Sequence, residues 1–204
     1  MAPLPPLSEP VRVEVADEVP NDRIHLAFRL PAEGGDTRDE FLAASMALDC
    51  LGGLSFSPLE QTLVREEQLA NSVDVGAMGF VDGVSLGLVV ADVADGVDTD
   101  ALEERICAEL TAFADAGPTP EQMEAVRAQA ERGWLSALAA KDERADIIGH
   151  YTCLHDDPGY VNTFLDHLAA VTAEQVQAAA DRWLRPQSRA AVVYRVAQDQ
   201  EEVA

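Results

Sequence analysis

The chain has few basic residues, and lysine is almost absent from it. Its 204 residues include 14 Lys and Arg against 37 Asp and Glu, which gives a formal net charge of −23, and Lys141 is the one lysine. Nucleic acids and anionic membrane surfaces are bound through clusters of basic side chains. The composition therefore predicts neither nucleic acid nor membrane as a partner.

Cysteine and long apolar runs are also scarce. Cys50, Cys107 and Cys153 lie far apart in apolar contexts, which predicts buried free thiols rather than a disulfide framework. The leading residues MAPLPPLSE lack the charged and apolar regions of a signal peptide. Both features favour a cytoplasmic location. No apolar run approaches the roughly 18 residues that a membrane span requires.

The sequence lacks the common motifs of a self-sufficient hydrolase or nucleotide-binding protein. It contains no G-x-S-x-G, G-x-G-x-x-G or G-x-x-x-x-G-K-[ST], and neither H-E-x-x-H nor H-x-x-E-H. The four histidines leave one local cluster, at residues 150–157. On a helix His150 and Cys153 share a face, whereas His155 is rotated from His150 by about 140°. We therefore expect no metal site there, only a helix end with a buried Cys153 and a histidine pair at the surface.

The periodicity of the apolar residues predicts an α+β protein. Short runs that alternate or are rich in β-branched residues predict strands, and apolar residues three or four apart predict helices. Short turns between neighbouring strands predict antiparallel pairs, with Asp82-Gly83 as a hairpin turn. We expect a mainly antiparallel sheet with helices packed on one face. Residues 1–10 are expected to form a proline-rich lead or linker, and residues 11–204 a single domain. The predicted strands are 11–15, 23–30, 71–81, 84–93 and 190–196, and the predicted helices are 38–51, 58–68, 100–116, 119–141, 160–168 and 172–184.

The segment 51–77, LGGLSFSPLEQTLVREEQLANSVDVGA, is the most distinctive part of the chain. A helix is predicted to stop at Gly52-Gly53, as a glycine beyond a helix end does. Ser57 and Pro58 then suit the cap and first position of a second helix. Further signals follow in order: GPTPE at 117–121, Trp134, DDP at 156–158, AVTAEQV at 170–176 and RWLRP at 182–186.

Together these motifs, from residue 11 to 196, resemble the second-half domain of the M16 zinc metallopeptidases, the family of insulinase and mitochondrial processing peptidase. The resemblance implies a LuxS/MPP-like fold. It also implies a peptide chamber closed by two facing domains, of which the first carries zinc on H-x-x-E-H and the second carries none. We therefore expect no catalytic residue, metal ligand or cofactor in this chain, and zinc in a partner domain of the same full-length chain or of another subunit.

The family's second half lends an Arg and a Tyr to the cleft, in a pattern that corresponds here to Val64 and Asn71. Neither residue matches, and Arg65 lies one position along, on a different helical face. The resemblance implies Arg65, Asn71, Ser57 and Gly53 as candidates for contact with a peptide substrate.

Three hypotheses follow from the sequence. The leading one is the non-catalytic half of an M16-like zinc metallopeptidase, inactive alone and closing the chamber over a peptide. The alternative is an M16-like domain without a peptidase role that serves assembly or peptide binding. The third is a small independent enzyme that uses His150 and Cys153.

Overall fold

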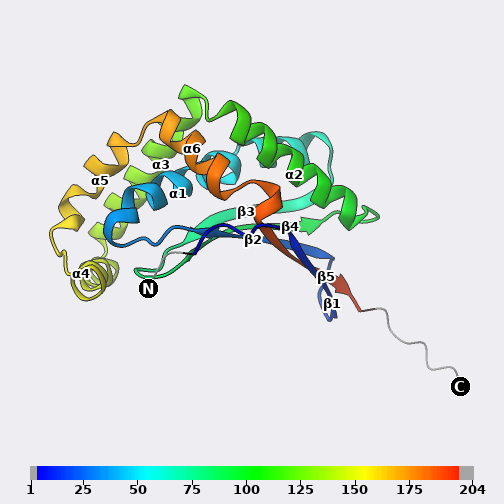
Figure 1. Ribbon diagram of the computed structural model, residues 1–204, viewed down its shortest axis with the longest axis horizontal. Coiled ribbons are helices and arrows are strands. Elements are labelled where there is room, and N and C mark those ends of the chain that lie inside the picture. The colour runs from blue at the N-terminus through cyan, green and yellow to red at the C-terminus, as the bar shows by residue number, and fades with distance from the viewer. Residues whose placement is uncertain (1–3, 198–204) are drawn as a thin grey trace, which may run out of the picture.

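A computed structural model describes residues 4–197, which form one five-stranded sheet with a layer of helices (Figure 1). The strand order is β1-β5-β2-β4-β3. The strands are β1 (Val11–Asp17), β2 (Arg23–Leu30), β3 (Ala70–Met78), β4 (Ser85–Val93) and β5 (Arg189–Val196). The helices are α1 (Arg38–Gly52), α2 (Thr99–Ala116), α3 (Pro120–Ala139), α4 (Lys141–His155), α5 (Tyr160–Ala170) and α6 (Ala173–Trp183). The chain also forms three short helical segments, which are η1 (Gly35–Thr37), the π-helix η2 (Glu60–Glu66) and η3 (Pro186–Ser188).

The helices cover one face of the sheet, as the sequence predicts. In β2 the residues Ile24, Leu26, Phe28 and Leu30 are buried, and they alternate with half-buried side chains on the opposite face. The same alternation continues in β4. Because side chains of a strand point alternately to its two faces, the core lies between the sheet and α1, α2 and α6, and the other face stays open.

The predicted pairing of the first two strands is wrong. β5 lies between β1 and β2, antiparallel to β2 and parallel to β1. The short turn after β1 therefore joins two strands that do not pair. β1 is an edge strand and is exposed on both faces, rather than half-buried as its alternation suggests.

The long predicted helix 119–141 is two helices. α3 ends at Ala139, Ala140 adopts an extended conformation with ψ 134°, and α4 starts at Lys141. The helix predicted at 58–68 is mostly the π-helix η2, which ends before Gln68, a residue with φ 52°. The hairpin turn at Asp82-Gly83 is part of a longer connection between Met78 and Ser85.

Two glycines and one cap differ in detail from the sequence prediction. Gly53 follows α1 with φ −80°, so it does not make the left-handed stop that the pattern suggests. Gly52 instead provides close packing, because a Cβ there would lie 2.1 Å from Cγ2 of Val75 on β3. Thr37 does not cap α1 with its side chain. The caps of α3 and α6 are full capping boxes, built by Thr119 and by Thr172.

The cysteines are only partly as predicted: Cys50 is buried, Cys107 is half-buried and Cys153 is exposed. Among residues 4–197, no helix combines the length and the apolar character needed to cross a membrane.

Candidate functional site

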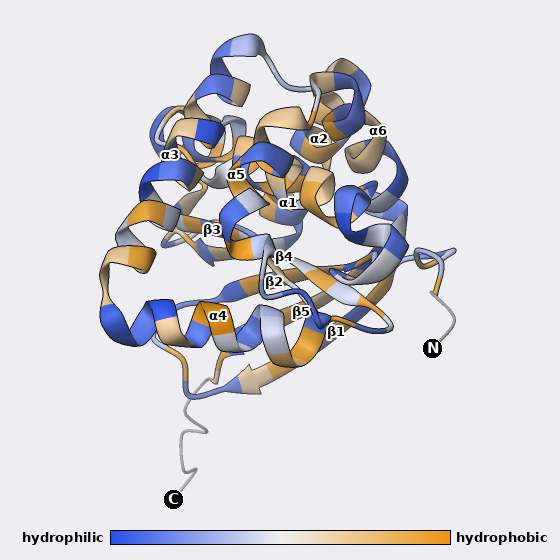
Figure 2. Ribbon diagram, turned by 90° about the vertical axis from the view of Figure 1, so that its left-hand side faces the viewer, coloured by the Kyte–Doolittle hydropathy of each residue, from blue (hydrophilic) through white to orange (hydrophobic). Residues whose placement is uncertain are grey.

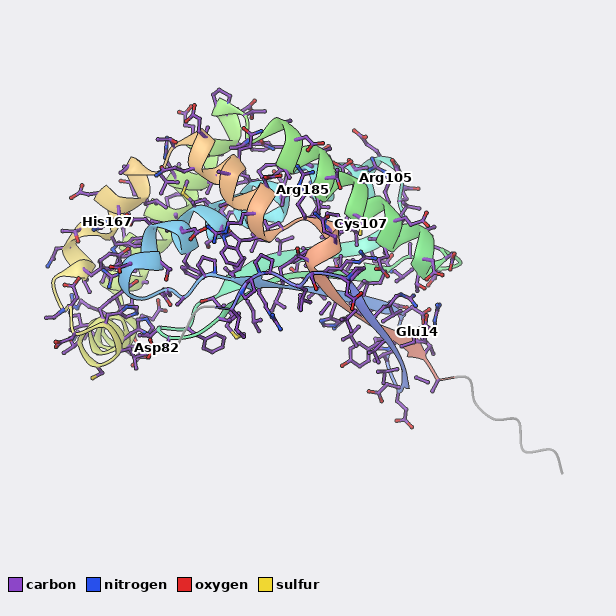
Figure 3. All side chains as sticks on the ribbon, viewed as in Figure 1. Glu14, Asp82, Arg105, Cys107, His167 and Arg185 are labelled. Atoms are coloured by element: carbon purple, nitrogen blue, oxygen red, sulfur yellow. The ribbon has the colours of Figure 1, made fainter. Side chains whose placement is uncertain are left out.

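In the part of the chain that the structure describes, the face of the sheet opposite the helices is not covered by any helix (Figure 1). Figure 3 shows its side chains projecting on the side opposite the helices. The register of the strands places apolar side chains of β1, β5, β4 and β3 on this face, with Val13 51% and Met78 49% exposed. We call this surface the open face. It comprises Val11, Val13, Val15, Arg23, His25, Ala27, Arg29, Ser72, Asp74, Gly76, Met78, Leu86, Leu88, Val90, Asp92, Ala190, Val192 and Tyr194.

A polar cluster interrupts the apolar side chains of the open face. Arg23 forms an ion pair with Asp92, its cross-strand partner, and Ser72 donates a hydrogen bond of 3.1 Å to the same carboxylate. His25 lies edge-on to Tyr194 at a centroid distance of 5.4 Å. Burial lowers the pKa of His25, and the charge of Arg23 adds to that effect, so the imidazole is neutral at neutral pH. The open face thus offers apolar contacts with a few fixed charges.

Two of the four predicted substrate contacts, Ser57 and Gly53, lie in the loop after α1. Ser57 is completely buried, and its hydroxyl accepts from the backbone N–H of Leu54 at 3.0 Å. The carbonyl of Gly53 accepts a hydrogen bond of 3.2 Å from Nε2 of Gln129 on α3. Both residues therefore hold the loop in place.

The other two candidates lie at the start of β3 and in the π-helix before it. Asn71 is exposed, sits at an irregularity in the β3–β4 register and donates from Nδ2 to the carbonyl of Val93 at 3.1 Å. The side chain of Arg65 is 54% exposed and lies 3.5 Å from Glu60. Val64 packs against the core. Of the four candidates, Arg65 and Asn71 can reach a ligand, and substrate contact by any of them remains a prediction.

The histidine cluster differs from the sequence prediction. The segment 150–155 is helical, yet Nε2 of His155 lies 3.1 Å from Nε2 of His150, and the pair approaches Glu33. Cys153 is exposed and outside this group. The backbone positions of the two histidines are rotated around the helix axis as expected. Their long side chains nevertheless bend toward each other at the end of the helix. Nothing in the local sequence connects them to Glu33, which is more than a hundred residues away.

The comparisons with known proteins identify the family. The family model described as the peptidase M16 inactive domain matches residues 2–130, which is more than half of the chain, so the chain belongs to this family. It is a C-terminal-type M16 domain. No curated protein matches the sequence.

Solved structures show the same fold. A protease from Helicobacter pylori matches with a TM-score of 0.82 and 18% identity, over 94% of this chain and 45% of that chain. The inactive peptidase domain of a Bordetella parapertussis protein matches with a TM-score of 0.79 and 18% identity, over 93% and 98% of the two chains. The peptidase M16 inactive domain from Pseudomonas fluorescens matches at 0.72 and 17%, over 98% and 47%. The predicted α+β, LuxS/MPP-like fold is therefore confirmed, and this chain spans less than half of the Helicobacter pylori protease.

Proposed function

We propose that this chain is the non-catalytic half of an M16 zinc metallopeptidase and closes a peptide chamber opposite a zinc-bearing H-x-x-E-H domain. The family of inactive M16 domains supports a catalytic partner domain, and this sequence itself contains no H-x-x-E-H. The zinc and the general base are then supplied by the partner, in the same full-length chain or in another subunit.

The open face is the observation that carries this proposal. Helices pack on one side of the sheet only, and the other side presents apolar residues such as Val13, Val90 and Met78 around the Arg23–Asp92 pair. A contiguous apolar surface with a few fixed polar groups is typical of a surface that another protein or a peptide covers. A facing domain and an extended peptide would cover it in the proposed chamber.

The test is peptide hydrolysis by the chain with and without an H-x-x-E-H protein from the same reading frame or a neighbouring one. We expect no hydrolysis of an unfolded peptide by the chain alone and hydrolysis by the mixture. Val90→Asp introduces a charge in the middle of the open face, and we expect it to lower the rate of the mixture by about ten-fold or more, since each factor of ten needs only about 1.4 kcal/mol.

Leu135→Asp is the matched control, because Leu135 is an exposed apolar residue on α3, away from the open face. It should leave the rate unchanged, and the melting temperatures of both variants show whether they fold. Full activity of a folded Val90→Asp variant, or hydrolysis by the chain alone, would contradict the proposal.

A second candidate is an M16-type domain that serves assembly or peptide binding without a peptidase role. The specific observation in its favour is that Val64 and Asn71 occupy the positions of the Arg and Tyr that the family pattern implies, and Val64 is packed into the core. Stable binding of the partner without hydrolysis in the same experiment supports this candidate.

A further inference from the structure

Glu33, His150 and His155 form a cluster of metal-ligating side chains at the end of the molecule where the β3–β4 connection lies. Glu33 belongs to the connection between β2 and η1, and both histidines belong to the last part of α4. One oxygen of Glu33 and one nitrogen of each histidine lie within 4.8 Å of one another. Figure 2 shows α4 set apart from the other helices, beside the end of the sheet.

The distances suit a tetrahedral ion. Two histidine nitrogens bound to Zn²⁺ at 2.0–2.1 Å lie about 3.3 Å apart in tetrahedral geometry. Here the Nε2 atoms of His150 and His155 are 3.1 Å apart, and Oε1 of Glu33 is 3.8 Å from Nε2 of His150. A bound ion would need rotations of these side chains to reach all three at bonding distance, with water in the fourth position.

The surroundings hold the three side chains in place. The backbone N–H of Glu33 donates to the carbonyl of Phe80 at 2.9 Å, and its carboxylate occupies the space that a Cβ at Gly79 would fill, at 2.1 Å. The ring of Tyr151 lies 5.1 Å from that of His150 and 5.2 Å from that of His155. These contacts keep the three side chains near one another.

One neighbouring side chain, Arg38, stands in the way of the ion-bound form of His155. A metal on Nε2 requires a proton on Nδ1, and Nη2 of Arg38 lies 3.4 Å from that atom. Arg38 also lies 3.4 Å from Asp157, and this carboxylate can hold the guanidinium of Arg38 when Arg38 turns away from His155. Moving Arg38 is the rearrangement that binding requires.

We propose that Glu33, His150 and His155 bind one Zn²⁺ as a structural site that ties α4 to the connection after β2. Two imidazoles and a carboxylate are donors that zinc takes. Within α4, all of which the structure describes, only Tyr151 is buried, so an ion adds a second attachment to the domain. The site is separate from peptidase chemistry and does not rest on the proposed function.

The test measures zinc binding to the untagged chain after removal of metal with a chelator. We expect calorimetry and metal analysis to give one zinc per chain, a higher melting temperature with zinc, and slower hydrogen exchange in α4. His150→Ala, His155→Ala and Glu33→Gln should each weaken binding by about ten-fold or more, since even indirect supports of a metal site cost that much.

Two control variants distinguish zinc binding at this cluster from zinc binding by other side chains. Cys153→Ser removes the exposed thiol of the same helix, and His167→Ala removes a histidine of α5, labelled in Figure 3, that lies outside the cluster. Both should bind zinc as the original chain does. The proposal is overturned if the original chain binds no zinc, if the double variant of His150 and His155 binds it equally well while its circular dichroism shows a folded protein, or if either control weakens binding as much as the ligand variants.

Discussion

Asp49 lies on α1 in a buried environment, and this burial changes its acid chemistry. Burial raises the pKa of its carboxyl from 3.8 to about 6. The folded chain therefore binds this proton more strongly than the unfolded chain does. The contribution of Asp49 to the free energy of unfolding is most favourable below about pH 4, declines as the pH rises to about 6 and is constant above.

We therefore expect Asp49→Asn to be more stable than the original chain at pH 7, by about 2 kcal/mol, and the gain to vanish near pH 4. A shift of one pKa unit corresponds to about 1.4 kcal/mol, and partial exposure reduces the total. Urea unfolding at pH 4, 5, 6 and 7 measures the difference. Asp166→Asn, at an exposed position of α5, is the control and should change the free energy of unfolding by less than about 0.5 kcal/mol. A gain that is the same at every pH would contradict the explanation.

Gly52 and Gly133 are helical glycines in opposite surroundings. A Cβ at Gly52 would lie 2.1 Å from Cγ2 of Val75, whereas a Cβ at Gly133 on α3 meets nothing within 4 Å. Gly52→Ala should lower the free energy of unfolding by about 1–3 kcal/mol through overpacking. Gly133→Ala should raise it by about 0.5–1 kcal/mol, because alanine favours a helix. Chemical denaturation of both variants checks the pair, and equal effects would show that the approach of α1 to β3 is not tight.

At the scale of elements, α2 is attached to the last and first strands through one buried carboxylate. The side chain of Glu103 is 6% exposed and lies 3.0 Å from Arg12 on β1 and 2.7 Å from Arg189 on β5. In the sheet β1 pairs only with β5, so this contact and the ion pair of Arg12 with Asp100, also on α2, connect it to the helical layer.

Glu103→Gln should lower the free energy of unfolding by about 2–3 kcal/mol, because it leaves two neighbouring guanidinium groups without their shared partner. Glu104→Gln, at the next and exposed position of α2, should change it by less than about 0.5 kcal/mol. Thermal unfolding of the two variants measures the contrast. Similar losses in both would mean that the buried contact of Glu103 is not responsible.

The elements also show what the sequence can and cannot predict. The capping signals at Thr119 and Thr172 and the alternation in β2 act over a few residues, so the sequence alone locates the start of α3 and the whole of α6 and β2. The place of β5 between β1 and β2 depends on residues far apart in the chain, and local turns suggest a different pairing. The break at Ala140 is made without glycine or proline, so no local signal marks it.

For the candidate site, too, the sequence predicts what nearby residues determine and misses what depends on residues far apart in the chain. The family motifs predict which segment faces a partner, but they do not predict which side chains are exposed there. Ser57 looks like a helix cap in the sequence, whereas tertiary packing buries it and turns its hydroxyl to the loop at Leu54. The cluster of Glu33 with His150 and His155 needs the fold to bring two distant segments together.

At the scale of the whole molecule, the net charge of −23 comes from outside the open face, whose own charged residues, Arg23, Arg29, Asp74 and Asp92, balance. An acidic surface raises the local concentration of basic ligands and speeds their encounter, and salt weakens this effect because it screens charges over about 8 Å at 0.15 M. In the assembled peptidase that we propose, peptides rich in Arg and Lys are therefore the preferred substrates at low salt.

Single acidic residues on the open face and on the helical layer give this preference a test that is specific to this chain. The ratio of kcat/KM for a basic peptide to that for the same peptide with Gln in place of Arg and Lys should fall as salt rises from 20 to 500 mM. Asp74→Asn removes an exposed charge of the open face, and Glu124→Gln removes one from the helical layer on α3. Because the interaction of two charges weakens with their distance, the first variant should lower the ratio at low salt more than the second. Equal effects of the two variants would mean that the open face does not face the peptide.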